Sequence, residues 1–120
     1  MKLAISLHAP NQNLRDILMP AVSKSNSLQD LFAVLDEYTE RTNKRITYEY
    51  VLLRDINDFT ENAKELAKLL KNRLALVNLI NYNENDCLPF KKSRNIFLFK
   101  RILIENGITC TIRKSLGEDI

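Results

Sequence analysis

The spacing of apolar residues along the chain changes between the period of a strand and that of a helix. In residues 45–53, every second position from Ile46 to Leu52 is apolar or aromatic, which is typical of a β-strand. Shorter apolar runs predict three more strands, at residues 3–7, 76–80 and 108–113. The sequence therefore predicts four strands, separated by stretches of different period.

The stretches between these runs carry apolar residues at the spacing of one helical face. Ser27 opens a capping-box pattern ahead of such a stripe, so we expect a helix from there to about Arg41. A second helix is expected at residues 60–71. A third is expected to begin at a Ser93 cap and to end at Gly107.

The segment after the first predicted strand is expected to hold one short helix. Asn11 can cap this helix, and Pro20 is expected to stop it, because proline lacks a backbone donor. Residues 23–26 are then expected to form a polar loop before the next helix.

Strands and helices thus alternate regularly, which is typical of parallel strands joined by helical crossovers. We therefore expect an α/β fold with four mainly parallel strands and intervening helices, in a single domain over residues 1–120. Four strands make a small parallel sheet, and the first begins almost at Met1. We further expect the chain to be the C-terminal part of a larger α/β enzyme.

Composition and charge narrow the function only slightly. A hydrophobic share of 45% is that of a globular protein, and a net charge of +3 permits nucleic-acid binding without indicating it. No apolar run suits a signal peptide or a membrane span, so we expect the cytoplasm. Cys87 and Cys110 form no cluster with His8, so we assign no metal ligand and interpret both as reduced thiols.

Candidate chemistry lies where the predicted strands end, because parallel α/β folds bind ligands at that edge. The residues there are Ser6, Leu7, His8, Arg54, Asp55, Asn57, Tyr82, Asn83, Arg113, Lys114 and Ser115. Since every strand runs into a polar loop, an ordinary solvated edge is the alternative. Glu49 lies mid-strand, where it either binds a ligand or is a paired structural carboxylate, and the residues alone favour the pair.

Five blocks of residues, in order along the chain, resemble the RlmN/Cfr family. The first is Leu-Ala-Ile-Ser-Leu-His-Ala-Pro-Asn at residues 3–11. The second is Arg-Ile-Thr-Tyr-Glu-Tyr-Val-Leu-Leu at residues 45–53, followed by Ile-Asn-Asp at residues 56–58. The others lie at residues 63–71, 77–83 and 107–120. Members of this family are radical S-adenosylmethionine (SAM) methyltransferases that act on C2 or C8 of an adenine in 23S ribosomal RNA.

The resemblance implies the C-terminal half of a partial (β/α) radical-SAM barrel. It implies that Ser6, Leu7 and His8 bind SAM, that Asn83 also contacts this cofactor, and that Glu49 faces the barrel interior. The expected activity is methylation of adenine C2 in 23S rRNA and also in transfer RNA, since C8 methylation belongs to a specialised branch. The expected partners are these RNAs and the missing N-terminal part of the enzyme.

The parts of the family pattern that this sequence lacks are equally informative. The family holds its [4Fe–4S] cluster with a CxxxCxxC motif upstream of the block at Ser6, and the chain has no such motif. Its methyl-carrying cysteine lies beside that motif or in an Ala-Ala-Cys-Gly block after residues 117–120, so neither Cys87 nor Cys110 matches it. Asn81 and Glu84 stand where the family usually has proline.

We therefore expect no catalytic residue in this chain and no methyl transfer by it alone. The alternative function is that of an inactive remnant that retains only RNA or protein binding. A third hypothesis, an independent flavodoxin-like binding domain, requires the resemblance to be accidental.

Overall fold

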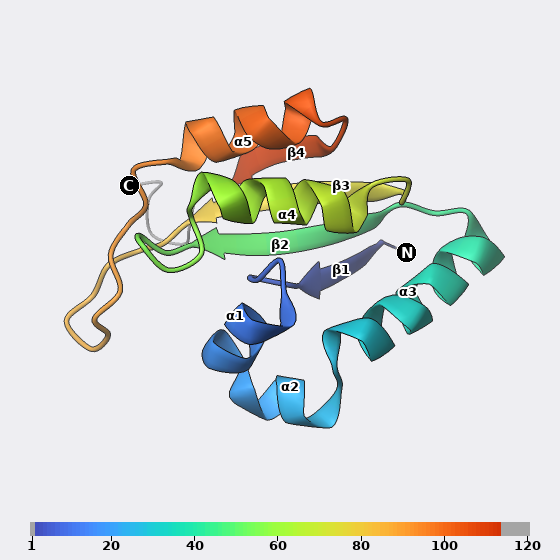
Figure 1. The fold of residues 1–120 in the computed structure, drawn as a ribbon, viewed down its shortest axis with the longest axis horizontal. Coiled ribbons are helices and arrows are strands. Elements are labelled where there is room, and N and C mark those ends of the chain that lie inside the picture. Colours follow the sequence, from blue (N-terminus) through green and yellow to red (C-terminus); the bar gives the residue numbers. More distant parts are fainter. Residues whose placement is uncertain (1, 114–120) are drawn as a thin grey trace.

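The computed structural model describes residues 2–113, and its centre is one four-stranded sheet (Figure 1). The strands are β1 (Leu3–Ser6), β2 (Ile46–Leu52), β3 (Ala75–Asn81) and β4 (Thr109–Arg113). They lie in the sheet in their order along the chain, and all three neighbouring pairs are parallel. The α/β fold predicted from the sequence is therefore confirmed.

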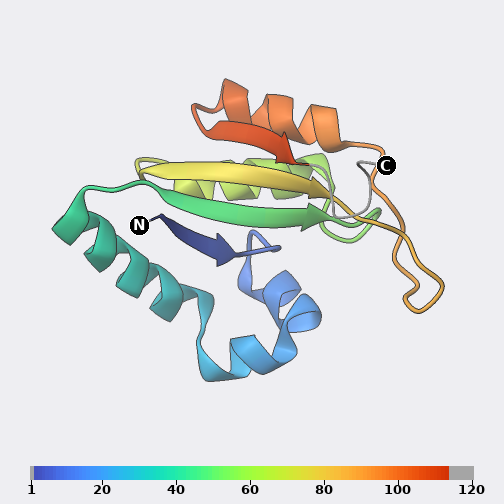
Figure 2. The same ribbon diagram turned by 180° about the vertical axis from the view of Figure 1, so that it is seen from behind.

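Helices form every connection between the strands. Three helices connect β1 with β2, namely α1 (Gln12–Leu18), α2 (Pro20–Ser25) and α3 (Leu28–Thr42). One helix forms each later connection, α4 (Thr60–Leu70) before β3 and α5 (Ile96–Glu105) before β4. From behind, the strands stand in front of α4, so this helix covers one face of the sheet (Figure 2). Among the described residues, no helix has the length and apolar character needed to cross a membrane.

The two faces of the sheet differ in burial because side chains alternate along each strand. In β2, the first, third, fifth and seventh side chains are buried under the helices. Phe32 of α3 stacks on Tyr48 with 5.7 Å between the ring centroids, and Phe99 of α5 packs on Tyr50 at 5.2 Å. The side chains between them, including Glu49, lie on the opposite face and are partly accessible. We call this second surface the open face.

Two helix starts follow the predicted capping chemistry. The Asn11 side-chain oxygen accepts a hydrogen bond from the Leu14 N–H at 2.9 Å and caps α1. The Ser27 hydroxyl accepts from the Asp30 N–H at 3.1 Å and caps α3. Each bond satisfies a backbone donor that a helix leaves free in its first turn. Both predicted caps are confirmed.

The first helix ends at Leu18, before Pro20, as predicted, but the polar loop predicted after it was wrong. Pro20 does not lead into a loop but occupies the first position of α2, which continues through most of the predicted polar loop to Ser25. Proline suits this position because its fixed φ matches a helix and its missing N–H would have no partner there. The same residue can therefore end one helix and begin the next.

The predicted cap of the last helix was also wrong. Asn95 is the N-cap residue of α5, while Ser93 lies two residues earlier. The Ser93 hydroxyl donates to the buried Asp58 carboxylate at 2.5 Å and accepts from the Asn95 N–H at 3.0 Å. Ser93 therefore connects the start of α5 to the loop after β2 instead of capping the helix.

Two adjacent residues of α5 provide a test of this packing. Leu103 is fully buried, whereas Ile104 is half exposed. We expect Leu103→Ala to lower the free energy of unfolding by about 2–5 kcal/mol, because the lost side chain leaves a cavity. The matched Ile104→Ala change should cost less than about 1 kcal/mol. Urea unfolding followed by circular dichroism measures both, and equal losses would contradict the packing described.

Candidate functional site

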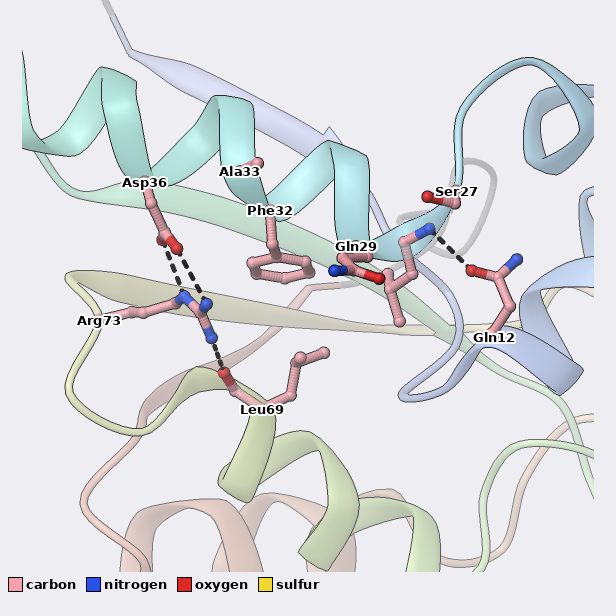
Figure 3. Close-up of a pocket in the computed structure, with 9 residues that line it drawn as sticks. Gln12, Ser27, Gln29, Phe32, Ala33, Asp36, Leu69 and Arg73 are labelled. Carbon is pink, nitrogen blue, oxygen red and sulfur yellow. Dashed lines mark hydrogen bonds and ion pairs between the residues drawn. The ribbon is translucent and has the colours of Figure 1, made fainter.

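A groove lies between α3 and α4 (Figure 3). It measures about 730 Å³ and is lined by Gln12, Ser27, Leu28, Gln29, Phe32, Ala33, Asp36, Leu69 and Arg73. The Arg73 guanidinium spans one end, where it bonds both Asp36 carboxylate oxygens at 2.9 and 3.0 Å and the Leu69 carbonyl. It also lies 4.7 Å from the centroid of the Phe32 ring. All three guanidinium nitrogens are hydrogen-bonded, so these contacts connect the two helices at this end of the groove. We call Arg73, Asp36 and the Leu69 carbonyl the clasp.

The contacts of the clasp also shift the pKa values of Asp36 and Arg73. Hydrogen bonding to Arg73 lowers the pKa of the Asp36 carboxyl, and the same bonds raise the pKa of Arg73. Both groups are charged at neutral pH and each is satisfied by the other. The groove therefore offers a ligand apolar surface and no free charge, and it lies away from the strand ends.

A smaller cavity of about 380 Å³ lies at the carboxyl edge of the sheet. Its lining is apolar and aromatic apart from one histidine: His8, Ile17, Leu18, Met19, Val51, Leu53, Ile56, Tyr82, Leu88 and Phe90. Tyr82 and Phe90 meet edge to face, with ring centroids 6.0 Å apart. An apolar cavity with one polar side chain suits a flat, partly polar ligand, because the walls bury the ring and the polar group orients it. We call it the edge pocket.

His8 is the polar member of the edge pocket, and its own backbone is unusual. Its φ is 56°, in the left-handed region that few residues other than glycine adopt. Its Nδ1 accepts a hydrogen bond from the Val51 N–H at 3.0 Å, so Nδ1 carries no proton. In the neutral ring the proton therefore sits on Nε2, which is available to donate.

Burial lowers the pKa of His8 from its ordinary value, although the nearby Glu49 carboxylate acts in the opposite direction. The bond from Val51 favours the same outcome, because a proton on Nδ1 would face another proton. His8 is thus a neutral hydrogen-bond donor at neutral pH.

Asn57 holds this arrangement together from the loop after β2. Its side chain is fully buried and donates from Nδ2 to the His8 carbonyl at 2.9 Å and to the Val51 carbonyl at 2.8 Å. Its Oδ1 accepts from the Leu53 N–H at 2.7 Å, and its backbone carbonyl accepts from the Tyr50 hydroxyl at 2.6 Å. The sequence placed Asn57 at the strand end but gave no sign of this role.

The structure brings only some of the predicted SAM-binding residues to the edge pocket. His8 lines it, and Asn83 is an exposed residue directly after Tyr82, which also lines it. Ser6 is exposed on the open face. The Leu7 side chain is fully buried in the core, so only its backbone could meet a ligand.

A row of polar side chains crosses the open face at the level of Ser6. The strand register aligns Ser6 with Glu49, Glu49 with Asn78, and Asn78 with Thr111. The Thr111 hydroxyl is hydrogen-bonded to the Asn78 side-chain oxygen. Arg113 reaches back across the sheet, and its Nη1 lies 2.7 Å from Glu49 Oε2. Glu49 is therefore a paired carboxylate that nevertheless lies on the accessible face.

The loop between β3 and α5 folds back on the end of β2. Lys92 forms an antiparallel bridge with Leu53, and the Arg54 N–H donates to the Lys91 carbonyl at 2.9 Å. Glu84 accepts from the Lys92 N–H at 2.9 Å, and this bond lowers the pKa of its carboxyl. Glu84, one of the two departures from the family pattern, thus fastens the loop that carries Asn83.

The two cysteines lie in unrelated places. Cys87 is exposed in the loop after β3, whereas Cys110 is buried in β4. Burial raises the pKa of the Cys110 thiol to about 12, which leaves it protonated and unreactive at neutral pH. The part of the chain from residue 2 to residue 113 contains no group of histidine, cysteine and carboxylate side chains that could hold a metal ion. The predicted edge residues Lys114 and Ser115 lie outside the described residues.

The sequence of the chain is similar to those of curated RNA methyltransferases. The chain is 46% identical to a probable dual-specificity RNA methyltransferase RlmN of Caldanaerobacter subterraneus and 43% identical to that of Streptococcus sanguinis. Both matches cover 100% of the chain, which spans only 35% and 34% of these curated relatives. No protein-family model matches it.

A solved structure gives the same result at the level of the fold. It is the crystal structure of a radical SAM methyltransferase from Sphaerobacter thermophilus, with 43% sequence identity and a TM-score of 0.94. The match covers 100% of the chain and 36% of that protein. The likeness therefore extends over every described element.

Because the sequence contains a single histidine, the titration of His8 can be measured without overlap. We expect its proton resonances to titrate with a pKa below about 6.5, since burial disfavours the charged ring. The unfolded chain then binds more protons than the folded one, so the free energy of unfolding should fall as pH drops from about 7.5 to 5.5. Urea unfolding across this range checks the slope, and His8→Gln should reduce it; a pKa above about 6.5 would contradict the geometry.

Proposed function

We propose that this chain, which belongs to the RlmN family as a match to the C-terminal part of its members, binds S-adenosylmethionine at the carboxyl edge of its sheet. We further propose that it is part of an enzyme that methylates C2 of an adenine in 23S ribosomal RNA. Transfer RNA is the second proposed substrate, in keeping with the dual specificity that the names of its relatives state. Such an enzyme works in the cytoplasm.

The observation that carries this proposal is the edge pocket. Its volume of about 380 Å³ and its apolar and aromatic walls suit the adenine ring of SAM, which stacks well on such surfaces. His8 supplies one neutral donor from Nε2, which fits the acceptor nitrogens of adenine better than a charged ring would. We therefore assign the pocket to the adenine ring.

The other proposed contacts come from residues that do not line this pocket. Ser6 offers its hydroxyl on the open face, and Asn83 offers its carboxamide from the loop beyond Tyr82. Leu7 contributes through its backbone, since its side chain belongs to the core. We also propose that residues 1–120 form one partial-barrel domain and that the open face lines the interior, which would place the Glu49–Arg113 pair beside the bound cofactor.

The chain's own residues do not suit the [4Fe–4S] cluster that radical SAM chemistry requires. When bound, that cluster supplies the electron that cleaves SAM and generates the radical. Cys87 is exposed in a loop and Cys110 is buried in a strand, and these are the only cysteines in the sequence. These 120 residues therefore supply no set of cluster ligands, and the part that we propose for them in the reaction is the binding of SAM.

Cofactor binding can be tested directly with S-adenosylhomocysteine, the product analogue of SAM. Isothermal titration calorimetry should detect binding of one molecule per chain. His8→Phe keeps an aromatic ring but removes both ring nitrogens, and with them the proposed donor, so we expect at least about tenfold weaker binding. Asn83→Ala should also weaken binding.

The control is Arg101→Ala, at an exposed residue of α5 that does not line the edge pocket, and this change should leave the affinity unchanged. If the chain bound no S-adenosylhomocysteine, or if none of the site variants altered the affinity, the proposed function would be wrong.

Methyl transfer provides a separate test. We expect the purified 120 residues to methylate neither ribosomal nor transfer RNA when supplied with SAM and a reductant under anaerobic conditions. The reason is that the sequence holds two cysteines and no CxxxCxxC motif. Mass spectrometry of the digested RNA detects methyladenine, and its appearance would show that another route to the reaction exists.

A further inference from the structure

The carboxamide of Asn57 uses all of its hydrogen-bonding groups. An asparagine side chain has one acceptor oxygen and two N–H donors. The oxygen accepts from Leu53, and the two donors go to the carbonyls of His8 and Val51. An aspartate has the same shape, but it would place a second oxygen against these two carbonyl oxygens. The site therefore requires an amide and not merely a polar side chain.

These bonds act on the residue that lines the edge pocket. By holding the His8 carbonyl, Asn57 stabilises a left-handed backbone conformation that is costly for a histidine. By donating to the Val51 carbonyl, Asn57 also fixes the end of β2. The Val51 N–H there donates to Nδ1 of the His8 ring. Both anchors of the His8 ring, its backbone and the donor to Nδ1, therefore depend on one buried side chain.

We propose that Asn57 is a positioning residue that fixes His8 as the Nε2–H tautomer in the edge pocket, where this ring donates a hydrogen bond to an acceptor nitrogen of a purine ligand. This inference deepens the proposed function and depends on it for the identity of the ligand. The tautomer itself follows from contacts within the chain and can be measured without any ligand.

The arrangement determines which ligands the pocket accepts. A fixed Nε2–H can serve only an acceptor, because the other ring nitrogen is occupied by the Val51 N–H. A ligand that presents a donor at the same point leaves two donors facing each other in an apolar cavity. The pocket should therefore select purines by their acceptor pattern as well as by their shape.

The single histidine allows a direct test by nitrogen NMR. The chain is labelled with ¹⁵N-histidine, and the long-range coupling pattern of the ring identifies the protonated nitrogen. At pH 7.5 we expect His8 to be almost wholly the Nε2–H tautomer. Asn57→Asp should produce a mixture of tautomers, raise the pKa of His8 and weaken binding of S-adenosylhomocysteine by about tenfold or more.

Asn62→Asp is the matched control. Asn62 is also a buried asparagine near this loop, but its side-chain oxygen only accepts from the Phe59 N–H at 3.1 Å. A carboxylate can make that bond equally well and suits the first turn of α4. This variant should keep the tautomer, the pKa of His8 and the affinity of the parent chain.

The outcomes separate the two proposals. An Nδ1–H or charged ring in the parent chain at pH 7.5 would overturn the inference, as would a folded Asn57→Asp chain with an unchanged tautomer. Should Asn57→Asp not fold, Asn57→Ser, which keeps one hydroxyl donor, carries the same test. If the parent chain shows the expected tautomer and Asn57→Asp disturbs it, but S-adenosylhomocysteine does not bind, the positioning role of Asn57 holds and the proposed cofactor is wrong.

Discussion

The candidate site depends on which groups form hydrogen bonds with the backbone of β2 beyond the point where β1 ends. β1 stops at Ser6, opposite Glu49, while β2 continues to Leu52. The N–H and C=O of Val51 consequently meet no strand on that side, and buried backbone groups without partners are costly. The His8 ring and the Asn57 carboxamide take the two positions. A structural requirement of the sheet thus fixes the orientation of a side chain in a pocket.

The same edge is reinforced by contacts between segments far apart in the chain. Asp58 accepts from Ser93, which ties the loop after β2 to the start of α5, and Glu84 and Lys92 close the loop after β3. These bonds lie in loops, where the backbone lacks the regular hydrogen bonds that neighbouring strands of a sheet provide. The result is that two adjacent strand ends are held together by side chains, and the edge pocket lies beside them.

The sequence predicts the repetitive parts of this fold well, because apolar periodicity follows directly from which face of an element is buried. The four strands and the caps at Asn11 and Ser27 are therefore found as predicted. It predicts the nonrepetitive parts poorly. Pro20 can equally stop a helix or start one, and Ser93 offers a hydroxyl that can equally cap a helix or bond a distant carboxylate. Only the neighbours in space decide between such alternatives.

The edge pocket illustrates the same limit for function. The family resemblance identifies Ser6, Leu7, His8 and Asn83 as a set, but in the fold their side chains have different surroundings. Leu7 is turned into the core, Ser6 lies on the open face, and His8 lines the pocket. A motif at the end of a strand alternates between the two faces of the sheet, so its members cannot all contact one ligand through their side chains. Asn57 lies in a block that resembles the family, but the resemblance gives it no role; its carboxamide bonds the carbonyl of His8, the only side chain of this set that lines the pocket. The residues that determine a binding site thus include those that satisfy the backbone behind it.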